Sequence, residues 1–345
     1  MEISDNKNKK TVTQDDVARR AGVSRSIVSY VLNPGSRPVA LETRKKVLQA
    51  IEDLGYRPNK FAQNLMKSAN DTVADKQFGL ILSDVFMLRR PYYADILAGI
   101  HTTAHENNHH IRFMRFFHDL KDPILFNELI HKEEISGLIL FSLDQSIKSD
   151  EDKKLIEQIR ARINNIICIE WELEGVSSVN FSRREAAYKA CNHLISKGKK
   201  NILYIGPLDN RIPGYQQAIL KNLGSENLLE PCFGSNLSDG YNICQSLIAE
   251  KKLPEAILGG TDEVSMGILR SLHQNNIKVP QDISIVSIDN IEMASFTNPP
   301  LTTVNVETWQ MGSVAVQTLI QRVKNRDSMI TQTLLPIQLI IRESC

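Results

Sequence analysis

At 345 residues, the chain is too long for one compact hydrophobic core and predicts two or three domains. Its net charge of +1 conceals an asymmetry: residues 1–68 hold 13 Lys or Arg against 7 Asp or Glu, a net +6, which leaves −5 on the remainder and predicts phosphate contact at one end. The polar start MEISDNKNKK, the lack of an apolar run of spanning length and five scattered Cys predict a cytoplasmic protein without a signal peptide, a membrane span or a disulfide framework.

Two short helices joined by a tight turn are predicted between residues 13 and 33. Thr13 can cap the first helix, Gly22 can end it, and Ser24 can cap the second. At about 100° per residue, one arc of the second helix is apolar, with Ile27, Val28, Val31 and Leu32. The other arc is polar and poor in acid, with Arg25, Ser26, Ser29, Tyr30 and Asn33. This polar face suits the base edges and phosphates of a DNA major groove, and the alternative is an ordinary solvated helix face.

The next stretch predicts a third helix and a short hinge. Residues 41–54 carry an apolar face formed by Val47, Ala50, Ile51 and Leu54. Ala40 precedes this helix without a capping side chain, a loss of about 1 kcal/mol, and Gly55 can end it. Asn59 can cap residues 60–66, which are too few to hold a helix alone in water. Residues 1–11 are expected to be a flexible tail and residues 68–77 a linker.

From residue 78 onward, apolar runs of strand length alternate with helical stretches. The runs are FGLILS, IRFMRFF, GLILF, NIICIE, NILYIG, EAILGG and ISIVSI. Continuous Ile, Leu and Val runs between helices are typical of parallel strands buried on both faces. The body is therefore predicted to have a doubly wound α/β architecture.

Several of these stretches together resemble the LacI/GalR family of bacterial transcriptional regulators. The run VTQDDVARRAGVSRSIVSYVLN, followed by ETRKKVLQAIEDLGYRPNKFAQNL, is similar to the DNA-binding headpiece and hinge of that family. PYYADILAGI, GGTDEVSMGILRSLHQNNIKVPQDISIVSIDN, NPPLTTV and the ending IIRES are similar to its body. The resemblance implies an all-α helix-turn-helix headpiece and a two-lobed core like that of periplasmic binding proteins, built from doubly wound parallel sheets.

The resemblance also implies domain boundaries. A helix-turn-helix DNA-binding domain is expected at 12–57, a hinge helix at 58–67, and an effector-binding and dimerisation core at 78–345. Lobe one of the core would span about 78–172 and 304–330, and lobe two about 173–303 and 331–345. No heptad tail follows Arg342-Glu343-Ser344, so a homodimer is expected rather than a tetramer.

The resemblance assigns DNA contacts residue by residue. The major groove would be read by Arg25, Ser26, Ser29 and Tyr30, and phosphates would be held mainly by Thr13, Ser24 and Asn33. Family members often carry Arg where Tyr30 stands, so a different base preference is expected there. In the hinge, Asn59 and Lys60 are also expected at the DNA, and Leu65 stands where the family inserts an apolar side chain into the minor groove. The alternative for Leu65 is an anchor on the body of its own chain.

Two residues at strand ends match the family's ligand-binding arginine and aspartate. Arg211 follows the strand NILYIG, and Asp289 ends the strand ISIVSI. Together they can read hydroxyls of a sugar-like or purine-like effector, or they can form a salt bridge with each other or lie in a solvated loop. Further effector candidates are Phe86, Tyr92, Trp171 and Thr261. Phe86 and Trp171 can equally be packing residues, and Thr261 can be only a helix cap.

Two other features bear on the effector side. Tyr93 follows Tyr92 where the family has an aromatic pair, and Phe181 stands where the family commonly has Asp, so that wall is expected to differ. His101, His105 and His109 recur every four residues on one predicted helix. No Cys or carboxylate completes a zinc site with them, so a solvated helix face is expected.

The sequence therefore predicts a sequence-specific DNA-binding transcriptional regulator, a repressor on a palindromic operator, that acts as a homodimer under control of a small effector in the cleft between the lobes. One alternative is a solute-binding sensor module without operator control, which explains the body but not the head. Another is a nucleotide-dependent enzyme, but the chain has no dinucleotide glycine fingerprint, phosphate loop or nucleophile elbow. No catalytic residue, metal or cofactor is expected, and inducer and corepressor logic both remain open.

Overall fold

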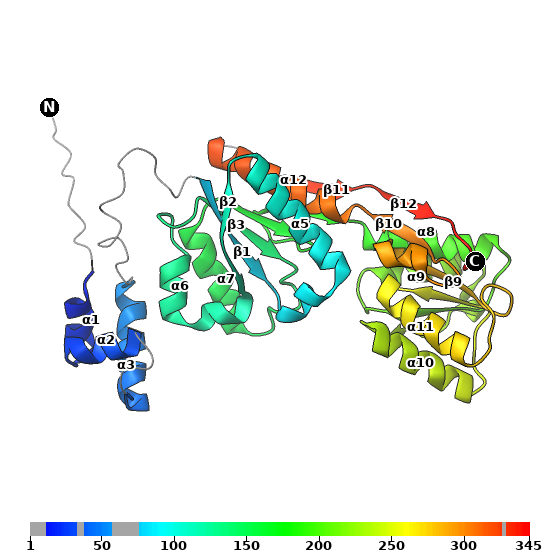
Figure 1. The fold of residues 1–345 in the computed structure, drawn as a ribbon, viewed down its shortest axis with the longest axis horizontal. Coiled ribbons are helices and arrows are strands. Elements are labelled where there is room, and N and C mark those ends of the chain that lie inside the picture. The colour runs from blue at the N-terminus through cyan, green and yellow to red at the C-terminus, as the bar shows by residue number, and fades with distance from the viewer. Residues whose placement is uncertain (1–11, 33–37, 57–75, 326–328) are drawn as a thin grey trace. The chain divides into compact units, whose positions relative to one another are not determined.

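The computed structural model describes residues 12–32, 38–56, 76–325 and 329–345, and it begins with a small helical head (Figure 1). The described part of the head contains α1 (Gln14–Ala21), α2 (Arg25–Leu32) and α3 (Leu41–Leu54). The two-helix unit and the third helix are thus confirmed. Gly22 and Gly55 follow α1 and α3 with φ values of 67° and 59°, the left-handed conformation that glycine adopts most easily.

One apolar cluster holds the three helices of the head together. It contains the apolar arcs predicted for α2 and α3, and its fully buried members are Val17, Val28, Val31, Val47 and Ile51. Tyr56 also packs there with 3% of its surface exposed, so the second residue after the end of α3 is fixed to the head core. Ala40 makes no side-chain hydrogen bond at the start of α3, as predicted.

Several sequence predictions lie outside the described residues. These are the flexible tail at residues 1–11, Asn33, the hinge with Asn59, Lys60 and Leu65, and nearly all of the linker at 68–77. They stay predictions.

The first sheet of the body has the strand order β11-β5-β4-β3-β1-β2. Its strands are β1 (Gln77–Leu82), β2 (His110–Phe116), β3 (Gly137–Phe141), β4 (Ile166–Ile169), β5 (Ser177–Phe181) and β11 (Gln332–Leu335). β1 pairs in parallel with β2 and β3, and its register with β3 sets Leu80 beside Ile139. The chain forms η2 (Val85–Arg89), α5 (Pro91–Glu106), η3 (Phe117–Lys121), α6 (Pro123–Leu129), α7 (Asp150–Arg162) and α12 (Thr308–Lys324) around it.

Helices cover the first sheet by burying apolar side chains against it. Phe126 of α6 and Ile159 of α7 belong to one cluster with Ile81 of β1 and Leu138 of β3. α12 approaches β3 at Gly137, where an added Cβ atom would meet the side chain of Leu319. The buried strands match the prediction for a doubly wound sheet.

The second sheet has the strand order β12-β10-β9-β8-β6-β7. Its strands are β6 (Ile202–Gly206), β7 (Cys232–Phe233), β8 (Ala256–Gly259), β9 (Ser284–Asp289), β10 (Thr302–Val306) and β12 (Ile337–Ile340). α8 (Arg183–Ser196) packs against α9 (Arg211–Asn222), and α10 (Leu237–Ala249) packs against α11 (Asp262–Gln274), while η4 (Ser225–Asn227) and η5 (Glu292–Phe296) lie in connections. β12 runs antiparallel to β10, so the predicted parallel sheet ends in one antiparallel edge strand.

The prediction that all seven runs are buried on both faces is wrong for IRFMRFF. β2 is an edge strand, and of its residues only Phe113 is buried. An edge strand has one neighbour, and helices cover less of it than of a central strand. Apolar content alone therefore did not distinguish the edge strand from the interior strands.

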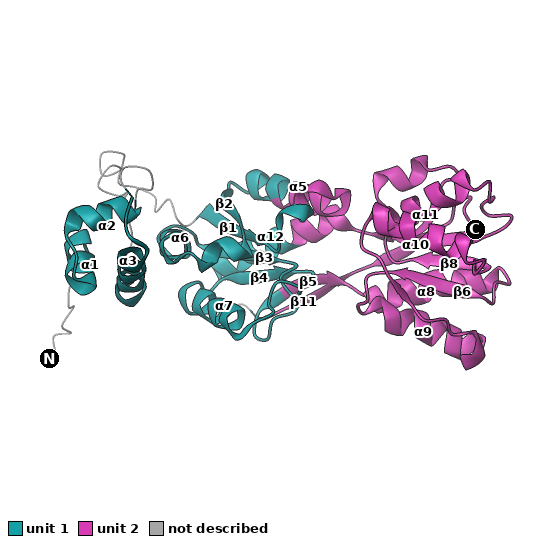
Figure 2. Cartoon of the chain, turned by 90° about the horizontal axis from the view of Figure 1, so that it is seen from below, with its two compact units in different colours: residues 1–87, 101–177, 315–330 teal, residues 88–100, 178–314, 331–345 magenta. Residues whose placement is uncertain are grey.

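Contacts divide the chain into two compact units (Figure 2). The first comprises residues 1–87, 101–177 and 315–330, and the second residues 88–100, 178–314 and 331–345. The N-terminal part of α5 therefore belongs to the second unit and its last turns to the first. Within the described ranges, no helix has both the length and the apolar character needed to span a bilayer.

Candidate nucleic-acid interface and effector site

The two cap residues of the head make the hydrogen bonds that their positions predict. The Thr13 hydroxyl accepts from the backbone N–H of Asp16, and the Asp16 carboxylate accepts from the backbone N–H of Thr13 at 2.9 Å, a complete capping box. At the start of α2, the backbone N–H of Ile27 donates to the Ser24 hydroxyl at 3.4 Å. Thr13 and Ser24 therefore each stabilise the start of a helix, independently of any contact with DNA.

The polar arc of α2 is accessible at its N-terminal end. Arg25 and Ser26 are exposed, and Ser29 and Tyr30 are half-buried. The Arg25 guanidinium lies 3.8 Å from the Asp15 carboxylate, and both side chains are more than half exposed. Such a pair is worth little in water, so Arg25 can exchange this carboxylate for a phosphate or a base edge at low cost.

An ion pair joins α1 to α3. Arg20 donates through Nε and Nη2 to one carboxylate oxygen of Asp53, at 3.1 and 2.7 Å, and Gln49 donates to the other oxygen at 3.0 Å. Hydrogen bonds from Gln49 and from Arg20 lower the pKa of the exposed Asp53 carboxyl. These contacts fix the angle between α1 and α3.

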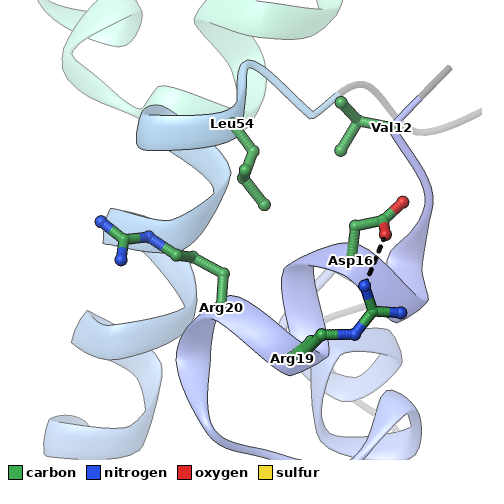
Figure 3. A pocket seen from close by; sticks show the side chains of 5 residues that line it. All are labelled: Val12, Asp16, Arg19, Arg20 and Leu54. Carbon is green, nitrogen blue, oxygen red and sulfur yellow. Dashed lines mark hydrogen bonds and ion pairs between the residues drawn. The ribbon is translucent and has the colours of Figure 1, made fainter. Parts of the chain in front are cut away.

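An open hollow of about 550 Å³ lies beside this ion pair (Figure 3). Of the residues that the structure describes, Val12, Asp16, Arg19, Arg20 and Leu54 line it, and none of these is a predicted DNA contact. Figure 3 shows Arg19 turned toward Asp16, to which it donates at 3.4 Å. The hollow is thus a gap between α1 and α3 and not part of the reading face of α2.

In the second unit, Arg211 is the first residue of α9 and is buried. Its Nη1 donates to the carboxylate of Asp209, whose other oxygen accepts from the Arg211 backbone N–H at 2.9 Å. Its Nε is buried and has no hydrogen-bond partner among the described residues. Burial lowers the pKa of Arg211, but the neighbouring Asp209 and Asp289 carboxylates and the Tyr204 hydroxyl outweigh burial and leave the pKa raised. A buried, charged guanidinium with an unused donor is suited to a hydroxyl or carbonyl of a ligand.

Asp289 ends β9 in a strained backbone conformation. Its φ is 124°, a region that costs a residue with a side chain about 1–3 kcal/mol. The side chain is buried, and its charge interacts with Arg211 and with Arg90. Arg211 and Asp289 therefore lie close enough in the second unit for their charges to interact. Arg211 forms an ion pair with Asp209.

Asp262 supports the turn after Asp289, and sequence reasoning did not single it out. Its carboxylate accepts from the backbone N–H of Ile291 at 2.9 Å and from the Thr303 hydroxyl at 2.6 Å. Burial raises the pKa of Asp262 to about 6. The Thr-Asp pair at the start of a helix was the available signal, but its partners lie far along the chain.

A second ion pair, also missed from the sequence, joins the start of α5 to the start of α11. Arg90 Nε donates to Glu263 Oε2 at 2.5 Å, and the guanidinium lies 5.4 Å from the centre of the Tyr93 ring. The Arg90 and Glu263 side chains are 23% and 10% exposed. Burial lowers the pKa of Arg90, and the Glu263 carboxylate more than compensates, so the pKa is raised.

The remaining effector candidates differ in their surroundings. Tyr92 is buried against Tyr93, edge to face with ring centres 5.2 Å apart, and it lies near Arg211. Thr261 is buried and caps α11 by accepting from the backbone N–H of Val264 at 3.3 Å. Phe86 is 64% exposed on η2, whereas Trp171 is half-buried against the apolar cluster of the first sheet. The cap role weighed for Thr261 and the packing role weighed for Trp171 are thus observed.

The three histidines do not share one helix face. His101 and His105 are exposed on α5, as expected, but α5 ends at Glu106. His109 is buried and stacks on Phe78 with ring centres 4.9 Å apart, so the solvated position predicted for it is wrong. In the part of the chain that the structure describes, no group of three His, Cys, Asp or Glu residues could hold a metal ion.

Comparison with known proteins identifies both parts of the chain. Residues 13–59 match the family model described as bacterial regulatory proteins, lacI family, and residues 191–345 match a periplasmic binding protein-like domain. The HTH-type transcriptional regulator RegA of Clostridium acetobutylicum is 31% identical over 345 residues, 96% of this chain and 98% of the relative. The NTD biosynthesis operon regulator NtdR of Bacillus subtilis is 28% identical over 342 residues, 96% of this chain and 99% of the relative.

A solved structure matches along the same length. It is the lac repressor dimer bound to operator and the anti-inducer ONPF, with a TM-score of 0.66 and 25% sequence identity. The match covers 97% of this chain and 99% of the other.

Proposed function

Because this chain belongs to the lacI family of bacterial regulatory proteins, we propose that it represses transcription as a homodimer on a near-palindromic operator, and that a sugar-like effector controls it. The chain is a DNA-binding transcriptional regulator and not an enzyme. The observation that carries the proposal is the head, in which α2 buries its apolar arc and leaves Arg25 and Ser26 exposed at its capped end. A protein that binds chromosomal DNA works in the cytoplasm, and we place it there.

Different residues of the head contact the base edges and the phosphates of the DNA. Arg25, Ser26, Ser29 and Tyr30 read base edges in the major groove, because they share the arc of α2 that faces away from the core. Contacts to phosphates are assigned mainly to Thr13, Ser24 and Asn33, and Leu65 is assigned to the minor groove. Two copies of the head would give a site with two half-sites, as in the operator-bound lac repressor dimer.

The effector site is assigned to the second unit around Arg211 and Asp289. Arg211 offers an unused buried donor, and Asp289 offers a carboxylate at a strand end. Tyr92 lies near Arg211 and can provide an aromatic wall. The anti-inducer bound to the lac repressor supports a small ligand of this kind.

Effector control requires that the ligand bind one state of the repressor better than the other. A ligand that prefers the DNA-free state acts as an inducer, and one that prefers the DNA-bound state acts as a corepressor. Thermodynamic linkage then makes operator binding change the effector affinity by the same factor.

Two measurements test the proposal. Selection of duplexes from a random pool with purified full-length protein, with and without metabolite extract, is expected to enrich a near-palindromic sequence. A thermal-shift screen of sugars, sugar phosphates and purines is expected to give ligands that stabilise the parent but not Arg211→Ala or Asp289→Ala. Failure to enrich any duplex would overturn operator binding, and equal stabilisation of both variants would overturn the assigned effector site.

A further inference from the structure

The charged groups around Arg211 and Asp289 occur in matched numbers. Arg90 pairs with Glu263 at 2.5 Å, and Arg211 pairs with Asp209. Asp209 also lies 3.6 Å from Arg183 Nε. With Asp289 these six residues are three guanidinium and three carboxylate groups with a formal net charge of zero, and the adjoining Asp262 and Arg342, whose charges are opposite, add none.

This balance differs from that expected of an anion-binding site. Arginine binds phosphate through N–H donors that are not already committed to a carboxylate, and the site then carries surplus positive charge. Here Arg90 and Arg211 each have a carboxylate partner, and both also interact with the charge of Asp289. A phosphate could accept from the unused Nε of Arg211, but its charge would then face these carboxylates without surplus positive charge to offset it. Hydroxyl groups, in contrast, can use donors and acceptors together without disturbing the pairs.

The Arg90–Glu263 pair lies at the start of α11, so the compensated charges extend to that helix. Glu263 lies in the first turn of that helix, where the helix dipole favours a negative charge. The pair is largely withdrawn from water, and removal of one partner from such a pair leaves the other poorly compensated. The interaction of Arg90 with Asp289 places the pair at the border of the site that contains Arg211.

We propose that Arg90 and Glu263 are effector-site residues that set its charge selectivity, so that the site takes an uncharged polyhydroxylated ligand and rejects its phosphorylated counterpart. The inference rests on the proposed function, because it names the ligand class of the same site. Glu263 neutralises Arg90, and a free Arg90 would attract a phosphate.

The first test compares each neutral sugar with its own phosphate ester on the full-length parent. D-Ribose is paired with ribose 5-phosphate and D-glucose with glucose 6-phosphate, within a wider panel of such pairs, by thermal shift and calorimetry. The neutral member of a binding pair is expected to bind at least about tenfold more tightly, because the site has no surplus positive charge. A phosphate ester that binds more tightly than its parent sugar would overturn the inference and leave the proposed function intact. A lack of any binding would overturn effector control itself and this inference with it.

The second test uses Glu263→Gln, which removes one negative charge and leaves Arg90 in surplus. Its affinity for inorganic phosphate is expected to rise at least about tenfold over that of the parent. Glu250→Gln is the matched control, because Glu250 pairs with Lys252 at 2.8 Å on the surface and the charge change is the same. Equal phosphate affinities of the two variants would overturn the role of the pair. If Glu263→Gln does not fold, the ranking of sugars and sugar phosphates on the parent decides.

Discussion

Tyr30 is the residue at which base reading can best be separated from phosphate contact. It lies half-buried on the polar arc of α2, where the side chain can reach a base edge. Tyr30→Ala is expected to cost about 1–3 kcal/mol on the selected operator and to relax base preference at one position of each half-site. Binding to duplexes mutated at each position, measured at one salt concentration, checks this.

Lys60→Ala is the control for Tyr30→Ala, because a phosphate contact carries no sequence information. It is expected to weaken cognate and random duplexes alike. If Tyr30→Ala also lowers both affinities equally, Tyr30 does not read bases.

Asp262 predicts an unusual pH dependence of stability at the turn after β9. Its folded-state pKa is raised to about 6 by burial, so the folded state binds a proton more strongly than the unfolded state. The parent therefore loses stability as pH rises from about 4 to 6, by about 3 kcal/mol for this group. Asp262→Asn cannot titrate, and its stability relative to the parent is expected to rise by up to that amount across the same window. The free energy of unfolding of the parent and of Asp262→Asn is measured across this pH range by urea unfolding and by hydrogen exchange of the backbone amides of residues 284–289.

Asp239 serves as the control, because its contribution to stability changes with pH in the opposite direction. Backbone and side-chain hydrogen bonds from Ser235 and Asn236 lower its pKa, so it stabilises the fold above pH 4 and loses that contribution in acid. The cost of Asp239→Asn is therefore expected to grow as pH rises. A parallel pH course for the two variants would contradict the assignment of Asp262.

Part of the proposed effector site could be predicted from the sequence, and part could not. Arg211 and Asp289 follow apolar runs that end at the ligand side of an open sheet, so local pattern and family resemblance both indicated them. The Arg90–Glu263 pair joins residues 173 positions apart, and no local pattern encodes such a contact. Trp171 illustrates the limit of a local pattern, since an aromatic residue after a strand is compatible with ligand contact and with packing, and the structure shows it half-buried against the apolar cluster.

At the level of elements, the start of α3 lacks its cap. Ala40 makes no side-chain hydrogen bond there, and its backbone has φ −57° and ψ 141°, outside the helical region as a cap residue requires. Ala40→Ser is expected to stabilise α3 by about 1 kcal/mol, because the new hydroxyl can accept from a first-turn N–H. Hydrogen exchange of the amides at 41–44 in the full chain measures the gain. Ala40→Gly is the control, and an equal gain from both variants would show that the backbone, not the hydroxyl, is responsible.

The helices of the head were predictable because their signals are local. A capping box, a glycine and a 3.6-residue period specify α1, α2 and α3 without reference to the rest of the chain. β5, with the sequence SSVNF, escaped the list of apolar runs because three of its five residues are polar, although all five are buried. β12 is short and half-buried, and its antiparallel pairing with β10 depends on a strand more than 30 residues earlier.

For the whole molecule, charge is distributed according to function. The first 68 residues carry +6 and the rest −5. Operator phosphates are thus attracted to the head and repelled by the body, while the matched pairs of the effector site leave its local charge near zero. The two ligands of the repressor are therefore expected to differ in their response to salt.

This difference can be measured on one sample. If each head dimer neutralises about six phosphates, operator affinity is expected to fall by about 10³ between 50 and 200 mM salt. The affinity for a neutral sugar effector is expected to stay nearly constant over the same range, because binding an uncharged ligand releases no counterions. Calorimetry of the effector and fluorescence anisotropy of a labelled operator, in the same buffers, give both slopes. A flat operator slope would mean that the basic head does not hold phosphates, whereas an effector slope as steep as that of DNA would mean that the effector is an anion.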